Sequence, residues 1–422
     1  MFVHSSNRLE CLVDALADVV GAAPLDPLLP ETIVVEGRGI ERWLGRCLAD
    51  RLGVWANAQF PFPRSFLRRA FAVVLDGEGD HLADPFDPDT LAWSVAAALL
   101  RLRTRPAFAP IAGYLDVQPG AGALLALSRR IARTLDQYLV YRPEWIAAWD
   151  DGRDDHWQAI LWREVAAGRS GRHVAARAAA FMRKIDAADL GPLPPRVCLF
   201  GLSTLAPLYL ECFAALARRR EVHLFLQSPS SHYWGDIRSK REVLRDRRRR
   251  GAAADDAATE ILAAAGNPLL ASLGGAGRDF QADLVGRVNF EDREAWDAPK
   301  PDTLLHTLQH DVFHLLDRRA AGQQKVRRDP ADESIQFHAC HGPLREVQVL
   351  HDRLRDLFEQ DATLQPHDVV VLCPEIDTYA PLVEAVFGAG GAGEDAAAPA
   401  AIPFRVADRR VRERDELVDA FL

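Results

Sequence analysis

The segment 32–52 constrains the fold most, because it reads as a buried strand, a glycine turn and an amphipathic helix. The β-branched run 32–35 predicts the strand, and Gly37-Arg38-Gly39 predicts the turn that follows it. The helix after the turn carries its apolar residues on one face, namely Trp43, Leu44, Cys47, Leu48 and Leu52. A strand, a glycine turn and a helix start are the layout of a loop that binds phosphate.

The chemistry that usually accompanies such a loop is missing. A P-loop needs Gly-Lys-Ser/Thr, because the lysine reaches the phosphates and the hydroxyl holds magnesium. The chain has four lysines, and none of them follows a glycine: Lys184, Lys240, Lys300 and Lys325. A second strand, 196–200, runs into Gly201-Leu202-Ser203 without the acid that holds magnesium in a motor protein. The sequence therefore predicts a motor-type scaffold that does not bind ATP as a motor does.

The composition predicts a cytoplasmic globular protein with a large core. The 422 residues indicate two or three domains, and no apolar run is long enough to cross a membrane. The six cysteines contain no Cys-x-x-Cys pair, so we expect reduced, mostly buried thiols and neither disulfides nor a zinc ribbon. A net charge of −9 is not that of a simple nucleic-acid-binding domain. Only four of the 51 basic residues are lysines, however, and the arginines allow a local basic channel.

The order of strands and helices predicts an α/β protein with a large helical insertion. Strands at 196–201 and 221–226 flank a helix at 207–218, which is a βαβ unit and implies a parallel sheet. Residues 88–186 have a helical pattern with few strand signals. We therefore expect three parts: a first lobe from 1–87 plus 187–333, the insertion at 88–186, and a second lobe at 334–422.

The second lobe is expected to be α/β as well. Its apolar runs predict strands at 334–338, 368–372 and 402–406, with helices at 343–357 and 379–387. The chain stops within a fresh helical pattern at 415–422, which suggests a piece of a longer protein. Before this lobe, a basic run at 238–250 and the Ala/Asp-rich segment after it favour a solvated insertion, with phosphate contact as the alternative.

Two groups of histidines have spacings that metal sites use. His306, His310 and His314 share one helical face, and the run His338-Ala339-Cys340-His341 follows a predicted strand. No further ligand is indicated for either group, so surface histidines are the favoured interpretation and a metal site is the alternative. Nuclease motifs of the Asp…Asp/Glu-x-Lys type and Gly-x-Ser-x-Gly nucleophile motifs are absent from the sequence.

Aromatic residues and arginines gather near a loop at 58–63 that prolines stiffen. They are Trp55, Phe60, Phe62, Phe66, Arg64, Arg68 and Arg69. Base stacking combined with phosphate contact would suit single-stranded DNA. The alternative is a core loop with surface arginines.

A series of distinctive stretches runs through the whole chain in order. They are HSSNRL at 4–9, GIERWL at 39–44, FPFP at 60–63, LDQYLVYRPEW at 135–145, YWGDI at 233–237, GNPLLAS at 266–272 with GRD at 277–279, and FHACH at 337–341 with REV at 345–347. In this order they resemble the RecC family, the gamma subunits of the bacterial RecBCD helicase-nuclease (exodeoxyribonuclease V). The stretches at 136–145 and 266–279 are the long and specific ones.

The resemblance implies a superfamily 1 helicase-like fold of RecA-like lobes, of the P-loop type but with a degenerate ATP site. It implies RecB-like and RecD-like partner subunits, which use ATP and magnesium, whereas this chain binds no cofactor. It also implies contact with a duplex end and with single-stranded DNA in double-strand-break repair by homologous recombination. RecC-like subunits hold the motor subunits together, split the duplex and scan the 3′ strand for a Chi recombination signal.

A set of DNA-binding residues is implied by the same resemblance. They are Glu36, Arg38, Arg42, Phe62, Arg68, Arg133, Asp136, Gln137 and Arg142. No catalytic residue and no metal ligand is implied in this chain. Two other hypotheses stay open: a scaffold that holds the motor subunits together without reading a sequence, and an active helicase or nuclease, whose motifs these residues lack.

Overall fold

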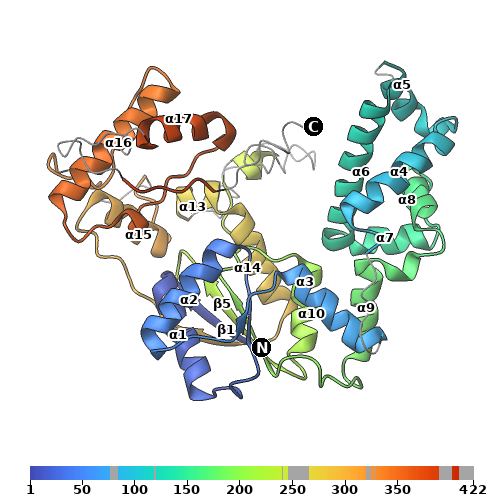
Figure 1. The fold of residues 1–422 in the computed structure, drawn as a ribbon, viewed down its shortest axis with the longest axis horizontal. Coiled ribbons are helices and arrows are strands. Elements are labelled where there is room, and N and C mark those ends of the chain that lie inside the picture. The colour runs from blue at the N-terminus through green and yellow to red at the C-terminus, as the bar shows by residue number, and fades with distance from the viewer. Residues whose placement is uncertain are drawn as a thin grey trace, which may run out of the picture. The chain divides into compact units, whose positions relative to one another are not determined.

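The computed structural model describes residues 1–76, 84–117, 120–239, 241–245, 266–319, 325–327, 329–388 and 402–407. The chain divides into two compact units, 1–328 and 329–422, which are described separately (Figure 1). The structure is mixed α/β, and its parallel sheet belongs to the first unit. Most of the predicted low-complexity insertion and the predicted helix at 415–422 lie outside the described residues.

Six parallel strands form the sheet within the described part of the first unit. They are β1 (Phe2–Ser6), β2 (Glu31–Val34), β3 (Ala58–Gln59), β4 (Arg196–Phe200), β5 (Glu221–Gln227) and β6 (Glu291–Glu294). Their order is β3-β2-β4-β5-β1-β6, and each neighbouring pair is parallel. The predicted βαβ unit is confirmed, because β4 and β5 pair directly and the helix α10 connects them.

Helices cover both faces of this sheet, which explains why its central strands are apolar on both sides (Figure 1). These helices are α1 (Leu9–Ala22) and α2 (Arg38–Leu52) on one face, with α3 (Pro63–Phe71) and α10 (Pro207–Leu216) among those on the other. Leu44 and Leu48 of α2 are fully buried against Ile33. Trp43 and Cys47 are half-buried against the same cluster, so four of the five residues predicted for the apolar face of this helix are confirmed. The fifth, Leu52 at the helix end, is exposed.

A set of helices lies between β3 and β4 in the chain. After α3 come a π-helical turn (Ala72–Asp76), α4 (Pro88–Leu102), a 3-10 turn (Pro106–Phe108), α5 (Ala109–Val117), α6 (Ala121–Tyr141), α7 (Pro143–Asp150), α8 (Trp157–Ala166), a 3-10 turn (Ser170–Arg172) and α9 (Val174–Lys184). Trp149 and Trp162 are buried in their core and donate their indole N–H groups to Asp154 at 3.1 Å and to Asp150 at 2.8 Å. A buried indole needs such a partner, so these bonds restrict how the helices pack.

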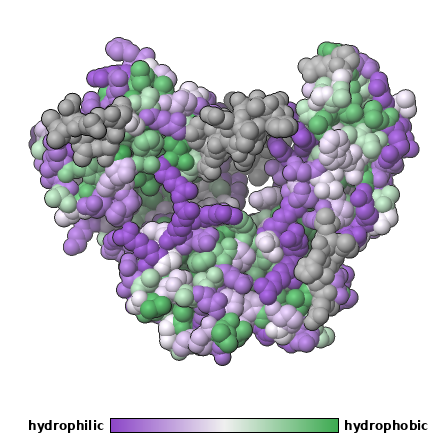
Figure 2. Space-filling model, in the orientation of Figure 1, coloured by the Kyte–Doolittle hydropathy of each residue, from purple (hydrophilic) through white to green (hydrophobic). Residues whose placement is uncertain are grey.

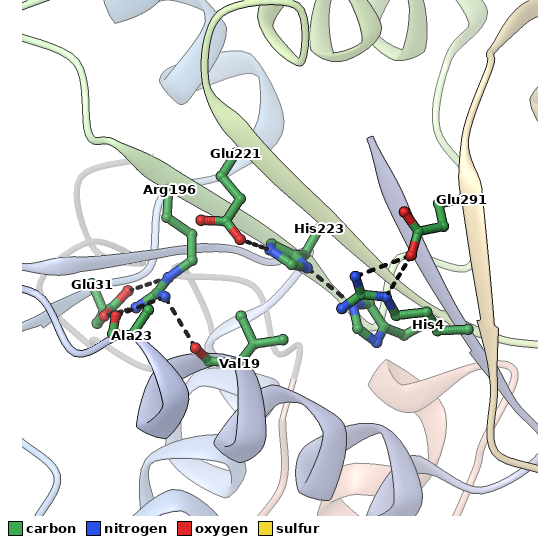
Figure 3. Close-up of polar contacts among 9 residues, drawn as sticks. His4, Val19, Ala23, Glu31, Arg196, Glu221, His223 and Glu291 are labelled. Atoms are coloured by element: carbon green, nitrogen blue, oxygen red, sulfur yellow. Dashed lines mark hydrogen bonds and ion pairs between the residues drawn. The ribbon is translucent and has the colours of Figure 1, made fainter.

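A row of polar side chains crosses the sheet face that α1 covers (Figure 3). Arg196 of β4 is buried and forms an ion pair with Glu31 of β2. Further along the row, His4 of β1 and His223 of β5 approach within 3.0 Å through ring nitrogens, and both are buried. Parallel strands rarely bury so many charged or titratable groups, because each must find a partner.

A separate apolar cluster explains two of the distinctive stretches of the sequence. It involves the helices α13 (Pro268–Leu273), α14 (Gly275–Arg287) and α15 (Leu304–Phe313). Trp234 is buried at its centre, and two glycines lie against the ring. A Cβ added at Gly277 would lie 3.0 Å from the ring of Trp234, and one at Gly274 would lie 2.6 Å from the carbonyl oxygen of Leu270.

Replacing Gly274 with alanine is therefore expected to destabilise the protein by about 1–3 kcal/mol, because the added methyl group overpacks a close contact. Gly275→Ala is the matched control, since its Cβ would meet only the Arg278 side chain, at 3.8 Å. Urea unfolding followed by tryptophan fluorescence measures both variants. Equal midpoints for the two would show that the close contacts with Leu270 and Trp234 do not restrict this glycine.

The second unit contains α16 (Pro343–Gln360) and α17 (Ile376–Gly388), with a 3-10 turn (Pro366–Asp368) between them. Both helices were predicted from the sequence. The strands predicted at 334–338, 368–372 and 402–406 are wrong, because the described residues there form no ladder. Phe337 is 94% exposed and Leu372 is 90% exposed. An extended segment becomes a β-strand only when its backbone N–H and C=O groups form hydrogen bonds with a second extended segment. Apolar composition alone does not supply that second segment.

All six cysteines are free thiols, as predicted, but the expectation that most are buried is wrong, because four of them are only half-buried. Cys198 and Cys212 are buried, and burial raises the pKa of both thiols. Among the described residues, no helix is both long and apolar enough to cross a membrane.

Candidate nucleic-acid interface

The path of the chain reverses across the sheet between β2 and β4. From β2 it continues through α2 to β3 on one side, and from β4 it continues through α10 to β5 on the other. Open parallel sheets bind ligands beyond the carboxyl ends of their strands at such a reversal. Glu36 follows β2 at this edge, and its carboxylate accepts a hydrogen bond from Ser203 Oγ, which follows β4, at 3.4 Å.

A glycine lets the start of α2 come close to the turn after β4. Gly201 has a φ of +65°, and a Cβ there would lie 2.9 Å from Ile40 Cδ1. A residue with a side chain would therefore meet backbone strain here, and its Cβ would have to displace the end of the Ile40 side chain. The close approach places the first turn of α2 at the reversal point of the sheet.

Two arginines of the predicted set extend from that first turn. Arg38 and Arg42 are exposed, and neither has an ion pair or a side-chain hydrogen bond within the described part of the chain. The first backbone N–H groups of a helix lack intrahelical partners and favour negative charge. Two guanidinium groups without an ion pair can donate hydrogen bonds to an anionic ligand, although Glu41 lies in the same first turn.

The loop before α3 adds an aromatic side chain to the same edge. The backbone N–H of Val35 donates to the carbonyl oxygen of Pro61 at 3.1 Å, which connects this loop to the end of β2. Phe62 is 45% exposed, whereas Phe66 on the first turns of α3 is buried. Arg68 is exposed on the same helix and has no ion pair among the described residues. The cluster near this loop therefore divides into core aromatics and surface groups.

The helix α6 presents two more of the predicted residues to solvent. Arg133 and Gln137 are four positions apart, so they share one face of the helix, and both are exposed. Neither has a side-chain partner among the residues that the structure describes. A guanidinium and an amide on one helix face can contact a phosphate and a base edge.

Asp136 lies on the adjacent face of α6 and is engaged within the protein. Its carboxylate accepts a hydrogen bond from Arg64 of α3 at 2.7 Å, and Arg64 also lies 3.5 Å from Asp84. The Asp136 side chain is only 22% exposed. Burial raises the pKa of the Asp136 carboxyl above its usual range, although Arg64 opposes the change. Asp136 therefore connects α6 to α3 and orients the exposed face of α6.

Arg142 ends α6, and its guanidinium lies over the ring of Trp145, 5.8 Å from the centroid. Its Nη1 donates to the carbonyl oxygen of Tyr141 at 2.9 Å. Arg142, Tyr141 and Trp145 are all exposed, at the junction of α6 and α7. Aromatic rings beside an arginine can stack on unpaired bases.

The structure connects some of the predicted residues and leaves others apart. A chain of contacts runs from Val35 through the Phe62 loop to Arg64 and Asp136. No hydrogen bond or ion pair among the described residues joins Arg142 to Arg38. Sequence reasoning missed the roles of Arg64 and Ser203. Arg64 and Asp136 are 72 positions apart, so no local pattern announces their pairing.

The charge of this surface differs from that of the whole chain. Four of its arginines form no ion pair within the described residues, although Glu36 and Glu41 lie next to the first two in the sequence: Arg38, Arg42, Arg68 and Arg133. No group of three or more His, Cys, Asp or Glu side chains that could hold a metal ion is found among the described residues. His310 and His314 do lie close, with ring centroids 4.4 Å apart.

The fold and this surface define an α/β protein with a parallel sheet and exposed, unpaired arginines where such sheets bind ligands. The chain belongs to the RecC family, because residues 1–315 match the family described as RecC, N-terminal domain. It is 35% identical to the RecBCD enzyme subunit RecC of Escherichia coli and 32% identical to that of Haemophilus influenzae, over its whole length. It is 33% identical to the RecC subunit of Mycolicibacterium smegmatis over 92% of its length. These alignments cover 40%, 42% and 34% of the relatives, so the chain spans about two fifths of their length.

Proposed function

We propose that this chain is the DNA-handling, non-catalytic part of a RecBCD-type helicase-nuclease in double-strand-break repair by homologous recombination. It binds the unwound 3′ strand, helps to split the duplex and reads a Chi-type sequence. The observation that carries the proposal is the group of exposed arginines without ion pairs at the reversal point of the sheet and on α6. Membership of the RecC family supports it, since the relatives are subunits of the RecBCD enzyme.

We further propose that the first unit is a superfamily 1 helicase-like lobe with a degenerate ATP site. The all-parallel sheet and the glycine turn without a lysine support this assignment. ATP and magnesium are then used by RecB-like and RecD-like partner subunits in the cytoplasm, and this chain binds no cofactor. Purified chain should show no DNA-stimulated ATP turnover.

Within this function, the surface groups divide into two kinds. Guanidinium groups at the helix start of α2 contact the phosphates or base edges of a passing strand, because both ligands accept the hydrogen bonds that they donate. Gln137 on α6 can both donate to and accept from a base edge. Asp136 acts through Arg64, since it holds α6 in place while its neighbours meet the DNA.

Arg42→Ala is expected to weaken binding of the preferred sequence by roughly 1–3 kcal/mol if Arg42 reads a base. If Arg42 contacts only phosphate, the loss of affinity should be similar for all sequences. The slope of the logarithm of the binding constant against the logarithm of the salt concentration should then fall in magnitude by about 1. We expect base reading by at least one of Glu36, Arg38, Arg42 and Gln137. The assay is Chi-type pausing and single-strand binding by the complex reconstituted from full-length subunits.

Arg46→Ala is the matched control, because Arg46 is exposed one turn further along the same helix. It should leave sequence response and affinity near the wild-type values. If alanine at all four positions preserves both signal response and DNA binding, the surface is not the reader. Loss of subunit assembly with intact DNA binding would instead favour a scaffold without sequence recognition.

A further inference from the structure

A groove of about 510 Å³ opens in the helical insertion between α5, α6 and α8. Its main lining side chains are Tyr114, Leu127, Arg130, Ile131, Thr134 and Trp157. Figure 2 shows hydrophobic residues at the surface of the insertion around the end that carries α5. The volume lies in the range of ligand pockets, and nothing in the described fold fills it.

The walls of the groove are flat and partly aromatic. Trp157 begins α8, and its ring meets Phe108 edge to face with centroids 6.3 Å apart, which holds it in place. Tyr114 of α5 is 46% exposed, so one side of the pocket opens to solvent. Leu127 and Ile131 of α6 complete the apolar part. Such walls suit the face of an aromatic ring.

Polar groups lie among these walls. The hydroxyl of Thr134 donates to the carbonyl oxygen of Arg130, so its lone pairs stay available as acceptors. Gln158 donates to the Tyr138 hydroxyl at 3.4 Å and keeps its carbonyl oxygen. Arg130 is exposed and forms no ion pair within the part of the chain that the structure describes. The groove therefore offers acceptors and a cation beside its apolar walls.

The groove is continuous with the proposed DNA surface. Arg130 and Thr134 lie on the stripe of α6 next to the one that carries Arg133 and Gln137. A strand that follows Arg133 and Gln137 would pass the mouth of the groove. An apolar side chain of a partner protein would use the walls but would gain nothing from Arg130 or from the acceptors.

We propose that this groove receives one unstacked nucleobase of single-stranded DNA, with Arg130 on the adjoining phosphate. The proposal rests on the proposed function and adds a base-binding pocket to it. The aromatic walls stack on the base, the acceptors meet its amino or imino hydrogens, and the arginine neutralises the backbone. The base enters sideways while the backbone stays on the exposed face of α6.

Ala126→Phe tests the proposal, because Ala126 lines the groove from an exposed position and the larger side chain would fill it. Ala121→Phe is the control, on the same helix but outside the lining. The protein is the complex of full-length subunits, and the probes are oligonucleotides with one abasic site moved along the strand. A 2-aminopurine base at the sensitive position reports stacking through its fluorescence.

In the wild-type complex, one abasic position should weaken binding by about 5- to 100-fold, and 2-aminopurine there should be quenched. Ala126→Phe should weaken binding of the intact strand by a similar factor and abolish both the abasic effect and the quenching. Arg130→Ala should weaken all sequences equally and lower the salt slope by about 1. Ala121→Phe should behave as wild type.

An Ala126→Phe complex that keeps wild-type affinity, abasic sensitivity and quenching would overturn the base pocket. Loss of a partner subunit from the Ala126→Phe complex, with DNA binding unchanged, would overturn it in favour of a protein-docking groove. The two proposals fail separately. If alanine at Glu36, Arg38, Arg42 and Gln137 weakens DNA binding while Ala126→Phe does not, only the base pocket is wrong. If those alanine changes leave DNA binding unchanged, the proposed function itself is contradicted.

Discussion

Glu31→Ala is expected to destabilise the first unit by about 3–5 kcal/mol, because it leaves Arg196 charged and unpaired inside the protein. Arg196 is 2% exposed, and its guanidinium pairs with both carboxylate oxygens of Glu31 (Figure 3). It also donates to the carbonyl oxygens of Val19 and Ala23, each at 3.0 Å. These two carbonyl groups lie at the C-terminal end of α1, so the Arg196–Glu31 ion pair connects this helix to the strands β2 and β4.

The expected loss comes from the buried charge and not from the value of the ion pair itself. Replacing both partners with apolar residues, as in Glu31→Leu with Arg196→Met, should therefore recover most of the stability. The stability of Glu31→Gln should lie between that of Glu31→Ala and that of the double variant, since glutamine keeps an acceptor for the guanidinium. Urea unfolding of the chain at pH 7.5 measures all three. If Glu31→Ala lowers the free energy of unfolding by less than about 1 kcal/mol, which is the upper limit for exposed ion pairs, the argument from the buried charge is contradicted.

Acid is expected to weaken the fold between about pH 6.5 and 4, by roughly 2–3 kcal/mol, through the histidines of the same polar row. Burial, helped by the nearby His223 and Arg293, lowers the pKa of His4 from 6.5 to about 4. Burial lowers the pKa of His223 as well. The unfolded chain then binds protons near pH 6.5 that the folded chain does not take up until lower pH. Stability is therefore complete above pH 6.5 and falls as the pH falls.

The hydrogen bonds between His4 and His223 indicate which substitution tests the expected loss of stability in acid. His223 Nε2 lies 2.9 Å from the Glu221 carboxylate and must donate to it, so His223 Nδ1 accepts from His4 Nε2 at 3.0 Å. His4→Gln keeps a donor for His223 and removes one titrating group. The charged groups that face His4 across the sheet, Arg293 and Glu291 of β6, stay in place.

Unfolding free energies at pH 7.5, 6.0 and 5.0 measure the effect. The slope for His4→Gln should be smaller than for wild type, and the control His156→Gln should keep the wild-type slope because His156 is exposed. Equal slopes for wild type and His4→Gln between pH 6.5 and 5 would show that His4 takes up its proton in the folded state as readily as in the unfolded state.

Local patterns predicted much of the first unit correctly. The strand, turn and helix of 32–52 appear as β2 and α2, and the βαβ unit appears as β4, α10 and β5. The long helices of 88–186 were also visible, because each buries one face that recurs at helical spacing. Such signals are local, since a helix satisfies its own backbone and only its apolar face depends on the rest of the molecule.

The strands predicted in the second unit failed for the opposite reason. Residues 334–338 alternate polar and apolar side chains and residues 368–372 have an apolar, β-branched run, yet the described chain gives neither a neighbouring strand. Pairing of strands is a non-local event that composition cannot report. The low-complexity insertion and the chain end fall largely outside the described residues, so those predictions stay predictions.

For the candidate site, the sequence by itself determined which residues are present and which are lacking: arginines and a glycine turn where a lysine and an acid would serve ATP. Only the tertiary structure decided their surroundings. Asp136 pairs with Arg64, whereas Arg38, Arg42 and Arg133 form no ion pairs among the described residues. A groove also opens beside α6. The physical reason is that burial and ion pairing depend on distances between segments far apart in the chain, whereas the residues of a motif can be read in order.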